Sequence, residues 1–187
     1  MDITPEEYNS VKFYQDSGFY YINTYLRKNE CDPDKLESIQ AHIKNLDNLF
    51  AKSSKTDKIL TVYRGESNVY EGINLGFIST SKNLHIAKKF AGSVGAVCEL
   101  NIQPNIPFID INTWNNSEAE IILPRGLTFT VKSKKITKKS KHYVIDVSLT
   151  ANVCEPCFWC NRGVCRASDG GPCSDCERWV SRRMTNL

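Results

Sequence analysis

The sequence predicts an α+β fold in which helices come first and a strand-rich segment follows. Apolar residues recur at spacings of three and four within residues 1–57, and from Ile59 the pattern changes to short apolar runs separated by turns. Helices followed by many short strands are typical of an α+β domain and not of an alternating parallel sheet. The chain has 187 residues, of which 41% are hydrophobic and 24% charged. This is enough for one globular domain and a small appendage.

Three helices are expected before the first strand. Asp34 is expected to cap one of them, because an apolar series with helical spacing follows it. That series is Leu36, Ile39, Ile43, Leu46 and Phe50. Residues 5–27 are rich in aromatic side chains and are broken near Gly18. This pattern predicts two helices that meet at a bend.

Short segments with strand character fill the next part of the chain. They are residues 59–65, 75–81, 95–102, 119–124, 127–136 and 142–149. Alternation of apolar and polar side chains is clearest in 95–102 and 142–149. A short helix is expected over residues 84–91. Residues 1–149 are therefore predicted to form one domain, mainly helical over 1–57 and mainly strands over 58–149.

The remaining residues, 150–187, form a region of different composition at the basic end of the chain. Residues 1–131 carry 13 Lys or Arg and 16 Asp or Glu, whereas residues 132–187 carry 11 and 5. This excess favours nucleic acid or an acidic protein as a partner, and a solvated basic surface is the alternative. No segment has the length and apolarity of a membrane span, and the N-terminus lacks a secretory pattern. An intracellular location is expected.

Six cysteines are crowded into this tail. They are Cys154, Cys157, Cys160, Cys165, Cys173 and Cys176. The pairs Cys157/Cys160 and Cys173/Cys176 have the spacing at which two hairpins share one tetrahedral zinc ion. Cys154 is an equally good first partner for Cys157. We expect a structural zinc site of four cysteines, with a binuclear cluster as the second possibility and disulfides only if the protein is exported.

Three fragments at the ends of predicted strands carry side chains suited to chemistry. Arg64, followed by Gly65, places a guanidinium at a sheet edge, where it can grip a phosphate. Residues 79–81 are Ser-Thr-Ser, which either line a ligand cavity or cap the following helix. Glu118 and Glu120 are two residues apart, so an extended chain would direct both carboxylates to one side. Paired acids opening an apolar strand are typical of active sites.

The order Arg, Ser-Thr-Ser, Glu-x-Glu resembles the R-S-E class of ADP-ribosyltransferases, which includes cholera-toxin-like toxins, clostridial actin- and Rho-modifying toxins and vertebrate ecto-enzymes. Segments 12–27 and 76–92, and EAEIILPRGLTFTV with the lysine-rich hairpin after it, also look like parts of this family. The resemblance covers about residues 10–149. It implies a split β-sandwich that holds NAD between two sheets, in a toxin-like effector or a viral enzyme.

The resemblance also implies roles for the residues of the three fragments. Arg64 would hold an NAD phosphate, and Ser79 would hydrogen-bond and orient Glu120. The Glu120 carboxylate would accept a hydrogen bond from the nicotinamide ribose and stabilise the positive charge that forms as the glycosidic bond breaks. The residues expected to contact NAD are Arg64, Gly65, Ser79, Thr80, Ser81, Phe90 and Glu120.

The acceptor side of the reaction is assigned in the same way. Glu118 would polarise the acceptor, which is typically arginine in family members with Glu at this position. Trp114, within residues 112–116, would touch the acceptor protein, and packing into the core is its alternative role. Two other functions stay open at this point: an NAD glycohydrolase that transfers ADP-ribose to water, and a catalytically silent module that binds nucleic acid or protein.

Overall fold

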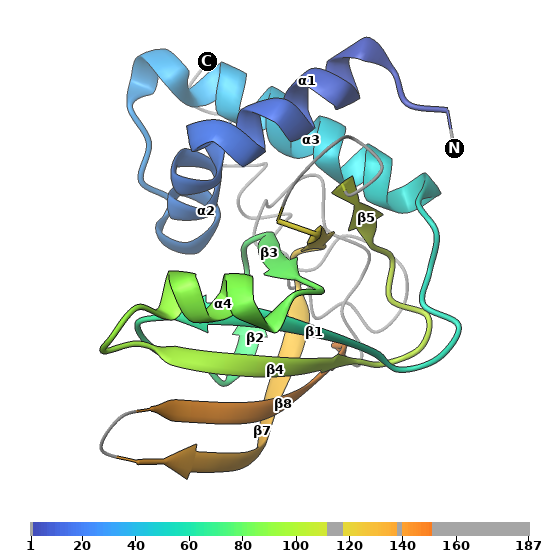
Figure 1. Cartoon of the computed structure of the whole chain (residues 1–187). Coiled ribbons are helices and arrows are strands. Elements are labelled where there is room, and N and C mark those ends of the chain that lie inside the picture. The colour runs from blue at the N-terminus through green and yellow to red at the C-terminus, as the bar shows by residue number, and fades with distance from the viewer. Residues whose placement is uncertain (1, 112–117, 138–139, 151–187) are drawn as a thin grey trace, which may run out of the picture.

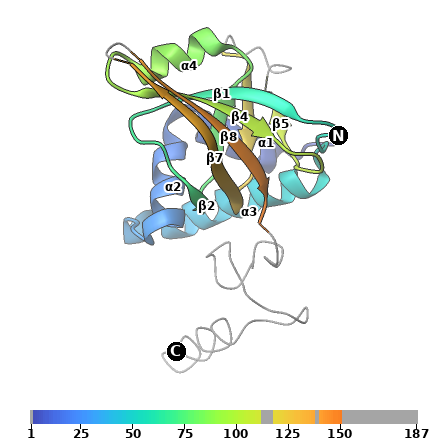
Figure 2. The ribbon, with the colours of Figure 1, turned by 90° about the horizontal axis from the view of Figure 1, so that it is seen from below.

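The computed structural model describes residues 2–111, 118–137 and 140–150, and it has the predicted α+β architecture. Its helices are α1 (Pro5–Phe13), a π-helix (Tyr14–Gly18), α2 (Phe19–Lys28), a 3-10 turn (Pro33–Lys35), α3 (Leu36–Lys52) and α4 (Leu84–Ala91). Its strands are β1 (Leu60–Glu66), β2 (Gly72–Asn74), β3 (Ile78–Ser81), β4 (Ala96–Ile102), β5 (Ile109–Asp110), β6 (Glu120–Leu123), β7 (Leu127–Ile136) and β8 (Lys141–Leu149). Helices α1–α3 gather on one side, and α4 lies apart from them over β1 (Figures 1 and 2).

Local sequence signals explain how the helical layer begins. Thr4 caps α1: its side chain accepts from Glu7 N, while the Glu7 side chain accepts from Thr4 N. The bend predicted near Gly18 is present as the π-helix that joins α1 to α2. The prediction that Asp34 caps α3 is wrong. The side chain of Asp32 accepts from Asp34 N and caps the 3-10 turn that leads into α3.

The strands form one sheet with the order β2-β7-β8-β4-β1-β3-β6-β5. Strands β1 and β3 share a single residue pair, Tyr63 with Ser81. The sheet therefore divides there into a five-stranded part and the three-stranded part β3-β6-β5. Strands β2 and β5, which were not predicted, add short edges to the two parts by pairing with β7 and β6.

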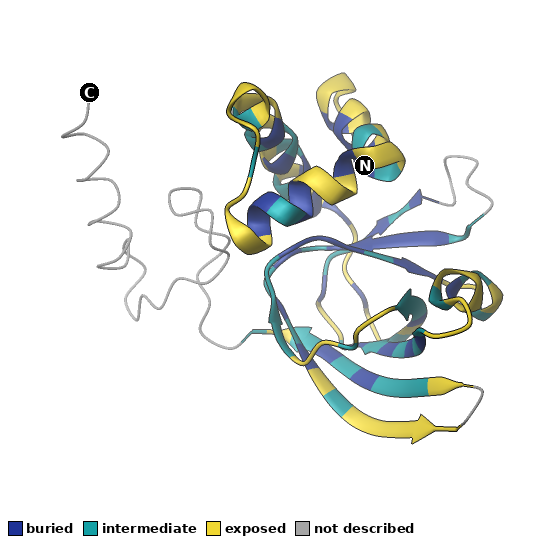
Figure 3. Cartoon of the chain, turned by 90° about the vertical axis from the view of Figure 1, so that its left-hand side faces the viewer, coloured by how far each residue is buried: buried dark blue, intermediate teal, exposed yellow. Residues whose placement is uncertain are grey.

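Two apolar cores hold the layers together, and β6 contributes to both. Ile122 packs in the core between the helical layer and the three-stranded part. Ile121 and Leu123 pack in the core between the two parts of the sheet. In Figure 3 the buried faces line these layers, while exposed residues cover the outer helix faces and the β7–β8 hairpin end. Because side chains alternate along a strand, Glu120 projects on the same side as Ile122, toward the helices.

An ion pair ties α1 to α3 and makes stability depend on pH. Lys52 Nζ lies 2.6 Å from Glu7 Oε2, and the Glu7 side chain is buried. Burial raises the pKa of Glu7, but the hydrogen bonds from Lys52 and Thr4 outweigh it, so that the pKa is lowered from 4.5. A lowered folded-state pKa stabilises the fold above the unfolded pKa, and this contribution is lost as pH falls through the folded pKa.

We expect Glu7→Gln to reduce the free energy of unfolding by about 1 kcal/mol at pH 7, near the upper end for partly exposed ion pairs. The difference from wild type should shrink below pH 4.5, where the unfolded carboxyl takes up its proton. Urea denaturation between pH 3.5 and 7 measures this. A difference that stays constant over the whole range would show that the charge of Glu7 is not the cause.

Several predicted features fall outside the described residues. They are the acceptor loop with Trp114, the lysines at 138 and 139, and the six tail cysteines. Within residues 2–111, 118–137 and 140–150, no cluster of three or more His, Cys, Asp or Glu is suited to a metal ion. None of the helices there has the length and apolarity needed to cross a bilayer. The zinc site thus stays a prediction.

Candidate active site

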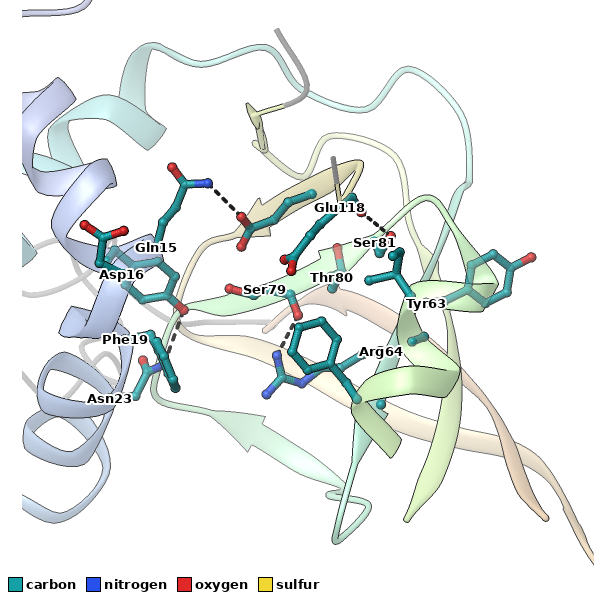
Figure 4. A pocket seen from close by; sticks show the side chains of 16 residues that line it. Gln15, Asp16, Phe19, Asn23, Tyr63, Arg64, Ser79, Thr80, Ser81 and Glu118 are labelled. Carbon is teal, nitrogen blue, oxygen red and sulfur yellow. Dashed lines mark hydrogen bonds between the residues drawn. The ribbon is translucent and has the colours of Figure 1, made fainter. Parts of the chain in front are cut away.

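A cavity of about 560 Å³ lies where the helical layer meets β1, β3, β6 and α4. Tyr14, Gln15, Asp16, Phe19 and Asn23 line it from the helical layer. The other lining residues are Tyr63, Arg64, Gly65, Ser79, Thr80, Ser81, Ile86, Ala87, Phe90, Glu118 and Glu120. All seven residues expected to contact NAD, and Glu118 with them, are therefore brought to one cavity (Figure 4).

The two glutamates reach this cavity by a geometry that differs from the prediction. Glu118 lies in a turn, Glu120 begins β6, and Ala119 between them has a φ of 51°. The residues are thus not two alternate positions of one extended strand. A left-handed conformation is costly for alanine and is found mostly where the surrounding structure enforces it. Here it is held by a hydrogen bond of 3.0 Å from Lys82 N to Ala119 O.

The hydroxyls of the Ser-Thr-Ser segment hold the main chain that carries the glutamates. Thr80 Oγ1 donates to Ile121 O at 2.8 Å, and Ser81 Oγ donates to Glu118 O at 2.6 Å. Both residues are buried. Neither caps α4, because the side chain of Asn83 does so. These two hydroxyls therefore fix the turn and strand on which Glu118 and Glu120 lie, in addition to lining the cavity.

Arg64 is fixed at the edge of the same cavity. Its Nη1 donates to Ser79 O at 2.6 Å, and its Nε pairs with Glu66. A guanidinium carries five N–H donors, so these two bonds leave capacity for a ligand oxygen. Arg64 also lines a second cavity of about 330 Å³, together with Arg27 and Asn74. Arg64 thus lies at the junction of the two cavities, and Arg27 adds a second cation to the smaller one.

The π-helix and α2 supply functional residues to which the sequence alone assigned no role. Gln15 Nε2 donates to Glu120 Oε2 at 3.0 Å. Asn23 Nδ2 donates to Phe77 O at 3.1 Å and to Tyr14 Oη at 3.3 Å, which anchors α2 to the residue before β3 and to the π-helix. Burial raises the pKa of the Tyr14 phenol, against the opposing effect of its bonds with Asn23 and Ser79. The aromatic segment 12–27 was the available signal, but it gave no roles to single residues.

Helix α4 forms the remaining wall. It crosses β1 so closely that a Cβ on Gly65 would overlap Ala87 O and Ala91 N. The close approach of α4 therefore requires a glycine at this position. Phe90, on the same helix, is 67% exposed and lies at the cavity wall.

A match to a known protein family identifies the class of protein that contains this cavity. The family model described as ADP-ribosyltransferase exoenzyme matches residues 1–73 and 66–152. The chain belongs to the ADP-ribosyltransferase exoenzyme family. Transfer of ADP-ribose from NAD to a protein acceptor is the activity of this family, so the predicted function is confirmed at that level. The match ends at residue 152, and the cysteine-rich tail of the transferase lies beyond it.

Bacterial ADP-ribosyltransferases are among the solved structures that have the same fold. Vis from Vibrio splendidus is 22% identical, with a TM-score of 0.63 over 80% of this transferase and 75% of Vis. BECa of C. perfringens, solved with NADH, is 16% identical, with a TM-score of 0.65 over 80% and 44%. Exoenzyme S from Pseudomonas aeruginosa, solved with bound carba-NAD, is 18% identical, with a TM-score of 0.63 over 77% and 74%. No curated protein matches the chain by sequence.

Proposed function

We propose that this transferase cleaves NAD at Glu120 and transfers the ADP-ribose to an arginine side chain that Glu118 receives. The observation that carries the proposal is the convergence of Arg64, the Ser-Thr-Ser segment and both glutamates on one cavity. The chemistry of ADP-ribose transfer calls for a cation that binds a phosphate and a carboxylate that stabilises a developing positive charge, and these residue types supply both.

The first step is the loss of nicotinamide. The bond between the nicotinamide nitrogen and C1′ of its ribose breaks, and the electron pair goes to the nicotinamide, which leaves as a neutral ring. C1′ is left with oxocarbenium character. Glu120 is 7% exposed, and its negative charge therefore acts in surroundings that screen it poorly. It stabilises a charge that develops only in the transition state, and for this reason it lowers the barrier.

Arg64 and Arg27 place the diphosphate during this step. Arg64 lies between the two cavities, so a diphosphate at Arg64 would direct the nicotinamide ribose toward Glu120 and the adenosine toward the smaller cavity. Burial lowers the pKa of Arg27, but a guanidinium stays charged at neutral pH even so.

We also retain in the proposal the predicted hydrogen bond from Ser79 to Glu120.

The second step is the attack of the acceptor on C1′. A guanidinium nitrogen forms the new bond to C1′ and gives its proton to Glu118, which lines the cavity beside Glu120. The complex of Vis with agmatine, which carries a guanidinium group, supports an arginine-type acceptor. Transfer to water in place of an acceptor is the competing reaction.

We propose that the enzyme acts inside a target cell, on an acidic protein partner.

A test with agmatine as the acceptor distinguishes the role of Glu118 from that of Glu120. We expect Glu118→Gln to lower the rate of ADP-ribosyl-agmatine formation about tenfold or more, because an amide cannot take the guanidinium proton. Release of nicotinamide by hydrolysis should persist in the same variant. Chromatography of the products, with mass detection, measures both rates in one sample.

Glu99→Gln is the matched control. Glu99 lies on β4, near His142 Nε2 at 3.8 Å, and it does not line the cavity. Its replacement should leave both rates at the wild-type level. If Glu118→Gln transfers ADP-ribose to agmatine as fast as wild type, the acceptor role of Glu118 is wrong. If the wild-type enzyme forms only free ADP-ribose with every guanidino acceptor tried, the protein is an NAD glycohydrolase and not a transferase to arginine.

A further inference from the structure

Glu120 receives a hydrogen bond from a segment far away in the sequence. Gln15 Nε2 donates to Glu120 Oε2 at 3.0 Å, across a separation of 105 residues. Figure 4 shows the Gln15 amide directed from the helical side onto this carboxylate. The bond joins the helical layer to β6, where the carboxylate is buried. An amide N–H bonded to a buried carboxylate fixes the rotamer of that carboxylate.

The π-helix gives Gln15 this position. A π-helix inserts an extra residue into a helical turn and changes the direction of the side chains that follow, and such segments are frequent at functional sites. Tyr14, next to Gln15, is fully buried, and its ring meets that of Phe77 edge-on with the centroids 6.0 Å apart. Asn23 bonds both Tyr14 Oη and Phe77 O. Gln15 is therefore presented by an anchored segment and not by a mobile surface turn.

We propose that Gln15 is a positioning residue for the reaction, which holds the Glu120 carboxylate toward the nicotinamide ribose through its amide. This inference rests on the proposed role of Glu120. A carboxylate has about four lone-pair sites, so the bond from Gln15 is compatible with a hydrogen bond from the substrate. Gln15 acts through Glu120, and its effect falls on kcat more than on KM because Glu120 acts in the transition state.

Other charged or titratable groups around the carboxylate come from three directions. Tyr14 and Asp16 lie on the π-helix, Glu118 on the turn before β6, and Tyr63 and Arg64 on β1. The ion pair of Lys82, which follows β3, with Asp110 of β5 does not line this cavity. Only the Gln15 amide is changed in the test, so a shift in the pH profile reports on its contact with Glu120.

Two variants test the proposal through nicotinamide release measured from pH 5 to 9. Gln15→Ala is expected to lower kcat about tenfold or more, with KM for NAD within about twofold of wild type, because the carboxylate loses its fixed orientation. Gln15→Glu places a second carboxylate against the first, and like charges at this distance make one of them hold a proton. The acidic limb of its pH profile should move upward by about one pH unit.

Gln40→Ala is the matched control. Gln40 on α3 donates to Tyr25 Oη at 2.9 Å and does not line the cavity, so its loss should leave the pH profile and kcat unchanged. A purely structural role for Gln15 would lower the unfolding temperature of both variants without moving the acidic limb. That result, or wild-type kcat in Gln15→Ala, overturns the proposal. An active Glu120→Gln enzyme would instead refute the proposed role of Glu120 itself.

Discussion

Glu120→Gln is expected to lower kcat for nicotinamide release by about 100-fold to 1000-fold, the usual cost of removing one electrostatic stabiliser of a transition state. Gln has nearly the same shape as Glu and keeps a polar side chain in the place that Gln15 contacts. The negative charge alone is lost. Since that charge acts on the oxocarbenium-like state and little on bound NAD, Kd for NAD should stay within about threefold of wild type.

Thermal unfolding and calorimetric titration with NAD should be measured on the same variant and on wild type. The unfolding temperature of Glu120→Gln should lie within about 2 °C of wild type, because the substitution preserves volume and opens no cavity. A variant that keeps more than about a tenth of the wild-type kcat would contradict the assignment of Glu120. If Glu120→Gln unfolds at a much lower temperature, its loss of kcat would not report on the role of the charge. Glu120→Asp then serves as the second variant, because it keeps the charge but withdraws it from the ribose.

The second large effect is expected from Gly65→Ala, a substitution that adds one methyl group. The new Cβ would overlap Ala87 O and Ala91 N, which are backbone atoms of α4 and cannot rotate away. Helix α4 must therefore move off β1. We expect a loss of about 3 kcal/mol in the free energy of unfolding, as for overpacked cores. We also expect about a tenfold weaker affinity for NAD, because Ile86, Ala87 and Phe90 of this helix line the cavity.

Gly92→Ala is the comparison for this experiment. Gly92 ends the same helix at a φ of 59°, and no atom lies within 4 Å of a Cβ built there. Its ψ of −152° belongs to a region that is essentially restricted to glycine, so alanine should cost about 1–3 kcal/mol through backbone strain alone, with unchanged affinity for NAD. Calorimetric titration with NAD distinguishes the two variants. Equal affinities for NAD in Gly65→Ala and wild type would show that α4 does not shape the cavity.

The sequence predicted the elements whose periodicity is strong. Strands β4 and β8, in which alternation is clearest, begin within one residue of the predicted starts and end where predicted, and α4 and β7 have the predicted bounds. Strands β2 and β5 were missed. They have three and two residues, too few for any periodicity, and exist because β7 and β6 offer them an edge. Tertiary pairing creates such strands, and a single sequence does not encode it locally.

The cavity residues on the strands and Phe90 on α4 were singled out from the sequence, whereas those on the π-helix and α2 were not. Arg64 and the glutamates stand out in the sequence because charged groups beside apolar strands destabilise the fold, and such groups are usually retained for a function. Gln15 and Asn23 lie in an ordinary amphipathic pattern, and the π-helix that directs Gln15 has no sequence signature of its own. The left-handed Ala119 was also not predictable, because alanine usually adopts helical or extended backbone.

The most direct test of the proposed transfer is the fate of NAD when the 187-residue chain is incubated with it and with agmatine. We expect nicotinamide to be released and ADP-ribosyl-agmatine to accumulate with it, at rates that fall together in Glu120→Gln. Intact NAD after prolonged incubation with folded wild-type protein would contradict this mechanism. The cavity that holds Arg64, Glu118 and Glu120 would then belong to a catalytically silent member of the ADP-ribosyltransferase exoenzyme family.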